Sequence, residues 1–182
     1  MRYAERLAFA VMLSCALVVL LLQEDAQLGI AGPRYNHSPS MPVGVYWFVP
    51  GLATRGEVVA ACLPDPYAQY ALAHKILEPS RHPCANGVEP IVKALAAVPG
   101  DVVDVGPQGV SVNGVLWPMS VVRRLNCHGQ REAFRMQPGR HIVAPDKVFL
   151  MGLHPCSWDS RFIGDVPRSS ITGPWYPIFT SN

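Results

Sequence analysis

Two serines are the first residues of this sequence that could do chemistry. Ser38 and Ser40 stand in the segment Ser-Pro-Ser-Met-Pro (38–42), at the entrance to an apolar, β-rich run. A serine hydroxyl is a weak nucleophile until a neighbouring base takes its proton. Clusters of serine and proline are also typical of ordinary turns. The segment can therefore act in catalysis only if another part of the chain supplies the base.

Lys93 is the candidate for that base. The chain has three lysines; Lys75 and Lys147 stand in polar surroundings, whereas Lys93 stands in the apolar run Ile-Val-Lys-Ala-Leu-Ala-Ala-Val (91–98). Burial disfavours the charged ammonium and lowers the pKa of a lysine, and a neutral amine can accept a proton. A second interpretation stays open, in which Lys93 faces solvent on an edge strand.

A third segment gathers polar residues beside glycine and aromatic residues. Residues 152–167 contain Gly152, Ser157, Asp159 and Arg161. Asp159 and Arg161 lie two positions apart, a spacing that does not pair side chains on a helix. An Asp–Arg pair could still hold this segment rigid, and an ordinary surface salt bridge is the alternative.

The three segments, in this order, resemble the type I signal peptidase superfamily of serine–lysine proteases. In that family, Ser-x-Ser-Met-Pro is followed by a lysine shortly before Pro-Gly-Asp, and then by a glycine-led segment that ends Ser-x-Asp-Ser-Arg. This chain has the matching residues at 38–42, 92–103 and 152–167. The resemblance implies a membrane-anchored peptidase that acts on exported precursor proteins.

The resemblance also implies a role for each matching residue. Ser40 would be the nucleophile and Lys93 the general base, and Ser38 with the Ser40 N–H would form the oxyanion hole. Four further residues match positions that orient the lysine or support the site. Ser157 matches the serine that orients the lysine. Gly152 matches the glycine that opens the segment, and Asp159 and Arg161 match a structural pair near the site.

Within the superfamily, the chain looks most like the conjugative-transfer branch of TraF-like peptidases. Its single apolar N-terminal run, its short length and the Tyr-Trp soon after the serines fit that branch. It departs from the wider family at Ala94, where arginine is common, and at 152–156, where Gly-Asp-Asn-Arg is usual. The branch implies a pilin precursor as substrate, which is hydrolysed or cyclised. The alternatives are a signal peptidase of broad range and a non-catalytic β module of a pilus or secretion apparatus.

The elements expected to carry these residues are mainly β. The 18 prolines and 15 glycines disfavour long helices after the N-terminal run. Strands are predicted at 43–49, 55–63, 90–98, 101–105 and 109–117, and two more within 140–153 on either side of a Pro-Asp turn. Asn113-Gly114 predicts a hairpin turn. One short helix is predicted between Asp65, as its N-cap, and Pro79. We expect a domain of small antiparallel sheets like that of signal peptidases, and we assign no element to the tail 164–182.

The N-terminal apolar run predicts a transmembrane helix. Residues 7–22 carry no charge and would span about 24 Å as a helix. Two arginines precede the run and two acidic residues follow it, so the positive-inside rule places the rest of the chain outside the cytoplasm. We expect residues 1–23 to be a retained anchor, with a cleaved signal peptide as the alternative. Residues 24–36 would be a linker, and 37–182 the periplasmic peptidase domain of a single-pass protein of the bacterial inner membrane.

The cysteines fit an oxidising compartment. The exported part contains an even set, Cys62, Cys84, Cys127 and Cys156, which permits two disulfides. We expect Cys62 to pair with Cys84 and Cys127 with Cys156, because short loops close most easily.

Several other classes of function lack support. The net charge is +2 and charged residues make up 15% of the chain, without a basic stripe, so we expect no nucleic-acid partner. The sequence has no Cys-x-x-Cys and no His-x-x-x-His spacing, so we expect no metal and no cofactor. A Ser–His hydrolase that uses His37 or His154 is a poorer hypothesis, since His37 lies only three residues from Ser40. The expected partners are a precursor protein and the lipid bilayer.

Overall fold

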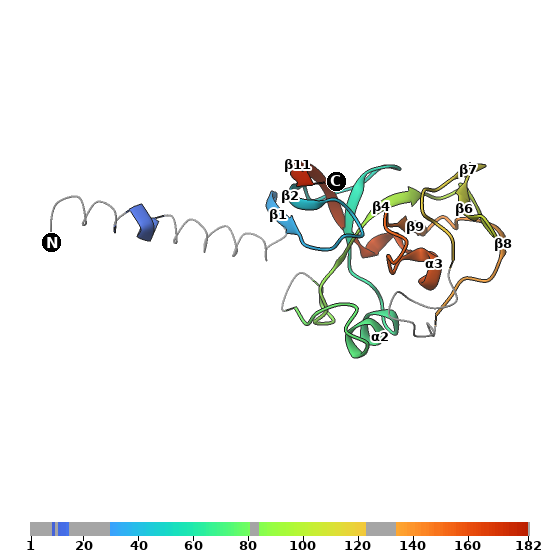
Figure 1. Ribbon diagram of the computed structural model, residues 1–182, viewed down its shortest axis with the longest axis horizontal. Helices are drawn as coiled ribbons and strands as arrows, with labels where there is room; N and C mark the ends of the chain where they lie inside the picture. Colours follow the sequence, from blue (N-terminus) through green and yellow to red (C-terminus); the bar gives the residue numbers. More distant parts are fainter. Residues whose placement is uncertain (1–8, 10, 15–29, 81–83, 123–133, 182) are drawn as a thin grey trace.

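The strands that follow residue 29 form two antiparallel sheets (Figure 1). The computed structural model describes residues 9, 11–14, 30–80, 84–122 and 134–181. The larger sheet has seven strands in the order β1-β2-β11-β3-β4-β9-β10, and the smaller has four in the order β7-β6-β5-β8. The strands are β1 Gly32–Asn36, β2 Val43–Phe48, β3 Val58–Ala61, β4 Ile91–Ala97, β5 Val102–Gly106, β6 Gly109–Val112, β7 Val115–Leu116, β8 Gly139–Ile142, β9 Lys147–Met151, β10 Val166–Pro167 and β11 Ile171–Ser181. Two short helices are described after residue 29, α2 Tyr67–Ala73 and α3 Ser160–Ile163, with a 3₁₀ turn at Arg168–Ser170.

Strand β4 runs through the centre of the domain. In Figure 1 it lies with β9 between the β1–β2–β11 end and the smaller sheet. All seven of its residues are buried, because apolar clusters cover both of its faces. Ile91 and Leu95 pack in one cluster with residues of α2 and α3, whereas Val92 and Ala94 pack in another with β2. Burial on both faces explains why this strand is an almost continuous apolar run in the sequence.

The predicted hairpin at Asn113-Gly114 is confirmed. Val112 pairs with Val115, so these two residues form the turn between β6 and β7. Both have positive φ, 51° for Asn113 and 81° for Gly114, as a two-residue turn of this type requires. The Asn113 side chain ties the turn to the start of β5, since its Oδ1 accepts a hydrogen bond from Val102 N at 2.8 Å.

The helices differ from the sequence prediction. Helix α2 ends at Ala73, well before Pro79, because the backbone turns at Lys75, which has a φ of 54°. Pro66 is its N-cap, and no side chain caps this end, so the cap expected at Asp65 is wrong. The four-residue α3 was not expected, since a single turn leaves no apolar periodicity in the sequence.

Two segments predicted to be irregular form strands. Residues 32–36 of the expected linker are β1, which pairs with β2 from Gly32↔Phe48 to Asn36↔Gly44. The tail contains β11, which lies between β2 and β3 despite its prolines and glycines. A Cβ at Gly44 would overlap with Phe179 O, so glycine is needed where these strands meet. Both strands exist through pairing with distant partners, which local sequence does not report.

The expected anchor, residues 1–23, lies almost wholly outside the described residues. Within it only residues 9 and 11–14 are described, and they are helical. Among the residues that the structure describes, no helix has the length and hydropathy needed to cross a bilayer.

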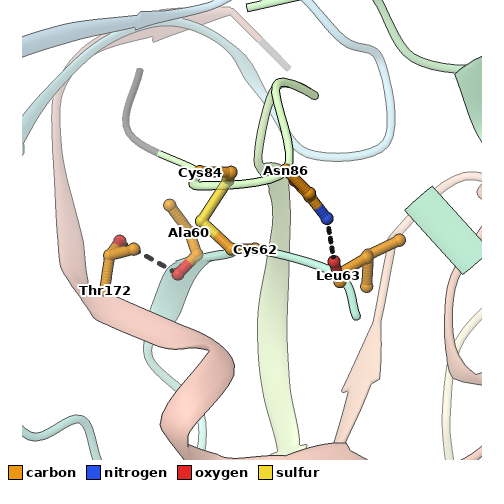
Figure 2. The surroundings of a disulfide bond; sticks show 6 residues. All are labelled: Ala60, Cys62, Leu63, Cys84, Asn86 and Thr172. Carbon is orange, nitrogen blue, oxygen red and sulfur yellow. Dashed lines mark hydrogen bonds between the residues drawn. A yellow bond between two sulfur atoms is a disulfide. The ribbon is translucent and has the colours of Figure 1, made fainter. Parts of the chain in front are cut away.

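The predicted disulfide between Cys62 and Cys84 is confirmed. It joins the end of β3 to the loop that leads into β4 (Figure 2). Beside it, Asn86 Nδ2 donates to Leu63 O at 2.8 Å, and Thr172 Oγ1 donates to Ala60 O at 3.1 Å. Cys156 is also disulfide-bonded. Cys127, its predicted partner, lies outside the described residues, and that pairing stays a prediction.

Removing this disulfide should lower stability. The bond closes a loop with a sequence separation of 22 residues, for which chain entropy predicts a stabilisation of about 3 kcal/mol. The double variant Cys62→Ser/Cys84→Ser should therefore unfold at a lower denaturant concentration, with a free energy of unfolding reduced by about that amount. Chemical denaturation of both proteins measures the difference. An unchanged midpoint would show that the bond does not constrain the unfolded chain.

Candidate active site

The two serines lie on the loop between β1 and β2. Ser40 is buried, with 9% of its surface exposed, and Ser38 Oγ accepts a hydrogen bond from Ser40 N at 3.3 Å. The loop is held by Asn36, whose side chain binds its backbone at four points. Asn36 is not among the site residues predicted from the sequence. Its place two residues before Ser38, where an asparagine side chain can bond to the backbone that follows it, is the signal that indicates this role.

Lys93 lies in the middle of β4 and is 3% exposed. Because β4 lies between β3 and β9, the alternative in which this lysine faces solvent on an edge strand is wrong. Its Nζ donates a hydrogen bond to Val92 O at 3.1 Å. Burial lowers the pKa of Lys93 from 10.5 to about 8, against the smaller opposing effect of the Asp159 carboxylate. The side chain can therefore give up its proton near neutral pH.

Strand β9 brings the serine loop to the level of Lys93. Ala94 pairs with Met151. Since the strands are antiparallel, Lys93, which precedes Ala94, lies at the same level as Gly152, which follows Met151. The next residue along, Leu153, donates its N–H to Ser40 O at 2.7 Å. Ser40 is thus attached to the strand end that flanks Lys93.

Gly152 stands at the junction of these parts. A Cβ at this position would overlap with the Ser157 side chain and would lie 3.1 Å from Ser40 O. Glycine therefore allows Ser157 to pack directly against the strand end. Ser157 is 1% exposed, and its Oγ makes no hydrogen bond within the described part of the chain. A buried hydroxyl without a partner is uncommon and marks a position suited to bonding a group that moves or binds.

Asp159 and Arg161 form a buried ion pair, so the surface salt bridge considered above is wrong. Both residues are fully buried, and Arg161 Nε and Nη2 each donate to the Asp159 carboxylate at 2.8 Å. Asp159 also caps α3 and accepts a hydrogen bond from Gly152 N at 2.8 Å. Arg161 donates further to the carbonyls of Met119 and Ser157. The pair thereby fixes the whole segment that begins at Gly152.

Breaking this pair should strongly destabilise the fold. Arg161→Ala would leave the Asp159 carboxylate buried without its partner, which costs about 3–5 kcal/mol. Arg55→Ala is the matched control: Arg55 Nη1 lies 3.1 Å from Asp101 Oδ1, but half of its side chain is exposed, so its loss should cost less than about 1 kcal/mol. Denaturant unfolding measures both. Equal losses would contradict the structural role of the buried pair.

A cavity connects the serine loop with Lys93. It has a volume of about 410 Å³, and its lining includes Ser38, Glu89, Ile91, Lys93 and Trp175. The carboxylate of Glu89 is the acidic group among the lining residues, and it lies 3.8 Å from His37 Nε2 at the rim. Ser38 and Lys93 therefore face one cavity, whereas Ser40 is not among its lining residues.

The histidines of the Ser–His hypothesis are engaged elsewhere. His37 is largely exposed and faces Glu89, and His154 Nδ1 accepts a hydrogen bond from Cys156 N at 3.1 Å. Within the described residues, neither ring is hydrogen-bonded to Ser40. Lys93 Nζ likewise makes its described hydrogen bond elsewhere, to Val92 O. Lys93 differs from both histidines in being buried, with a pKa lowered to about 8.

Known proteins resemble this chain over about two thirds of its length or more. Residues 1–179 match the family described as signal peptidase, peptidase S26. The conjugal transfer protein TraF of Agrobacterium tumefaciens (strain 15955) is 32% identical over 99% of this chain and 98% of its own length. A plasmid transfer protein TraF of Escherichia coli is 30% identical over 82% of this chain and 84% of its own length. A signal peptidase I from Enterococcus faecalis V583 has a TM-score of 0.39 and 19% identity, and covers 69% of this chain and 98% of its own.

The sequence matches decide the family. The family match and the TraF of Agrobacterium tumefaciens each extend over nearly all of this chain, including the three segments that form the site. The chain therefore belongs to the signal peptidase family, peptidase S26, and its relatives include the TraF proteins of conjugal and plasmid transfer.

Proposed function

We propose that the protein is a membrane-anchored serine endopeptidase in which Ser40 is the nucleophile and Lys93 the general base. One observation carries this proposal above the others. The lysine with a pKa of about 8 is buried on a central strand, and the strand end beside it is hydrogen-bonded to the backbone of Ser40. This arrangement supports Lys93 as the base that the Ser40 hydroxyl would need, without a histidine.

The reaction proceeds in two stages. The neutral Lys93 amine takes the proton of Ser40 Oγ, and the oxygen attacks the scissile carbonyl carbon. The resulting tetrahedral intermediate expels the amine of the leaving segment, which receives the proton from Lys93, and an ester to Ser40 remains. Lys93 then takes a proton from a second nucleophile, which attacks the ester carbon. The bond between that carbon and Ser40 Oγ breaks, and Lys93 returns the proton to Ser40 Oγ. Water gives a linear product, whereas the amino group of the same substrate gives a cyclic one.

Ser38 and the Ser40 backbone would stabilise the developing oxyanion. The Ser40 N–H donates to Ser38 Oγ in this structure, over a long distance of 3.3 Å. A substrate oxygen that enters between them would replace that bond and accept from both the N–H and the rotated hydroxyl. Such paired donors are aimed at the charge that appears in the transition state.

Three further residues would support the base. The unpartnered Ser157 hydroxyl is suited to orient the Lys93 amine, and Gly152 leaves the space for it. The Asp159–Arg161 pair holds the segment on which Ser157 stands. In this proposal, the segment that begins at Gly152 contributes to catalysis by holding Ser157 in a fixed position beside Lys93.

The substrates would be precursor proteins that carry their own membrane segment. The resemblance to TraF-like peptidases implies a pilin precursor, and two relatives are named for conjugal and plasmid transfer. The apolar run at residues 7–22 would anchor the enzyme in the bacterial inner membrane, with the peptidase domain in the periplasm. The serine loop begins shortly after that run, so the cut would be made close to the bilayer surface.

Mass spectrometry of co-expressed proteins tests this function. The full chain and its Ser40→Ala form are each co-expressed with a pilin precursor and, separately, with an exported precursor that carries an Ala-x-Ala cleavage site. We expect cleavage of the pilin precursor by the wild type alone. A product lighter by one water than the linear peptide would indicate cyclisation. Equal cleavage of both precursors would indicate a broad-range signal peptidase, and cleavage of neither would indicate a non-catalytic module.

A further inference from the structure

The side chain of Asn36 holds the loop that carries both serines. Asn36 ends strand β1 and is 3% exposed. Its Nδ2 donates to Ser38 O at 2.9 Å, to Pro42 O at 3.0 Å and to Met41 O at 3.2 Å. Its Oδ1 accepts a hydrogen bond from Ser38 N at 3.1 Å. One buried amide thus binds the backbone on both sides of Ser40.

These bonds act on the groups that the proposed mechanism uses. Ser38 is held at both its N–H and its carbonyl, which places its Oγ beside Ser40 N. Asn36 also binds the carbonyls of Met41 and Pro42, which follow Ser40. The Ser40 carbonyl itself accepts a hydrogen bond from Leu153 N. The loop is therefore tied to β1 by Asn36 and to the end of β9 by Leu153.

A carboxamide suits this position better than a carboxylate does. It supplies N–H donors and a carbonyl acceptor from one planar group. An aspartate would keep the acceptor for Ser38 N but would place a charged oxygen against three carbonyl oxygens. The Tyr46 hydroxyl also donates to Pro42 O at 2.7 Å, so this carbonyl would keep a partner. The Met41 carbonyl has no second side-chain donor among the described residues, whereas the Ser38 carbonyl also accepts from Met41 N at a long 3.5 Å.

We propose that Asn36 is a positioning residue of the peptidase, whose amide holds Ser38 and Ser40 in register with Lys93. This inference rests on the proposed function. Asn36 does not exchange protons or touch the reacting carbonyl; it acts through the loop. Misplacing a catalytic group by about 1 Å can cost about 100-fold in rate, so the loss should appear in kcat.

The test compares two Asn→Asp variants of the full chain in detergent, with the pilin precursor as substrate. Asn36→Asp should lower kcat by about 10- to 100-fold and change KM by less than about threefold. The pH midpoint of activity should stay near 8, because the change acts on the serines and not on Lys93. Asn113→Asp is the matched control. Its amide also accepts from a backbone N–H and donates to an oxygen, in this case Asp101 Oδ1, in the hairpin of the smaller sheet. It should keep the wild-type kcat.

A double-variant cycle separates positioning from general stability. Ser38→Ala alone should cost about 10²- to 10³-fold in kcat. The double variant Ser38→Ala/Asn36→Asp should lose less kcat than the two single fold-losses multiplied together, since both changes disturb the same loop. Wild-type kcat in folded Asn36→Asp, or a fully multiplicative loss, would overturn the proposal. If Asn36→Asp does not fold, Asn36→Ala takes its place; failure of both to fold would assign Asn36 to fold stability and also overturn it. Full activity in Ser40→Ala would instead overturn the proposed function.

Discussion

Ser40→Ala should abolish cleavage without unfolding the protein. The variant removes the oxygen that forms the acyl ester, and loss of such a nucleophile costs about 10⁴-fold or more in kcat. Ser40 is held by its backbone carbonyl, which bonds to Leu153 N and is unaffected by the change. Its hydroxyl makes no hydrogen bond to another described residue, so the free energy of unfolding should change by less than about 0.5 kcal/mol. Single-turnover cleavage of a precursor and denaturant unfolding measure the two effects.

Two other serine variants serve as controls for this result. Ser169→Ala alters an exposed serine in the 3₁₀ turn and should leave activity unchanged. Ser38→Ala should weaken cleavage but leave it measurable. An inactive Ser38→Ala beside an active Ser40→Ala would transfer the nucleophile to Ser38.

Activity should rise with pH through the pKa of Lys93. Only the neutral amine can accept the Ser40 proton, and burial lowers the pKa of this lysine to about 8. The rate should therefore reach half its maximum near pH 8 and be about 100-fold lower at pH 6 than on the plateau, because each unit below the pKa reduces the neutral fraction tenfold. A profile of kcat/KM against pH measures the midpoint in the free enzyme. A midpoint below 7 would instead indicate a histidine.

Lys93→Arg should be as inactive as Lys93→Ala. A guanidinium keeps its charge at all these pH values and cannot act as a base. His37→Ala and His154→Ala are the controls, and both should retain the chemistry. Substantial cleavage by Lys93→Arg would exclude a general-base lysine.

The same lysine should make stability depend on pH. Between about pH 8 and 10.5 the unfolded chain binds the Lys93 proton and the folded chain does not, so wild-type stability rises with pH over this window. Below pH 8 the folded state bears the full cost of a buried charge, on the order of 3 kcal/mol. Lys93→Met should therefore be more stable than the wild type at pH 7, and the difference should disappear near pH 10.5. Denaturant unfolding at several pH values measures it.

Local sequence patterns predicted several elements correctly. Strand β2 follows the apolar run after the serines, and the hairpin follows Asn113-Gly114, because turn chemistry and side-chain alternation act over a few residues. The Cys62–Cys84 pairing was also predicted, since loop closure depends mainly on separation along the chain. The order of the catalytic segments identified Ser40 and Lys93 as candidates by resemblance.

Elements that depend on distant partners were not predicted. Strand β11 is formed because β2 and β3 both lack a neighbour on the side that it fills. Strand β1 is formed because its partner β2 follows after the serine loop. In both cases the hydrogen bonds that stabilise the strand come from elsewhere in the chain, so its own proline and glycine content was misleading.

The sequence by itself determined which side chains can react: two serines, one lysine in an apolar run, and the family to which their order belongs. Only the tertiary structure decided that Lys93 is buried, because the apolar clusters around β4 come from β2, α2, α3 and β9. It alone decided that Asp159 and Arg161 pair away from water and that Asn36 holds the serine loop. The pKa of a lysine depends on the dielectric and the charges around it, and those are set by residues far away in the chain.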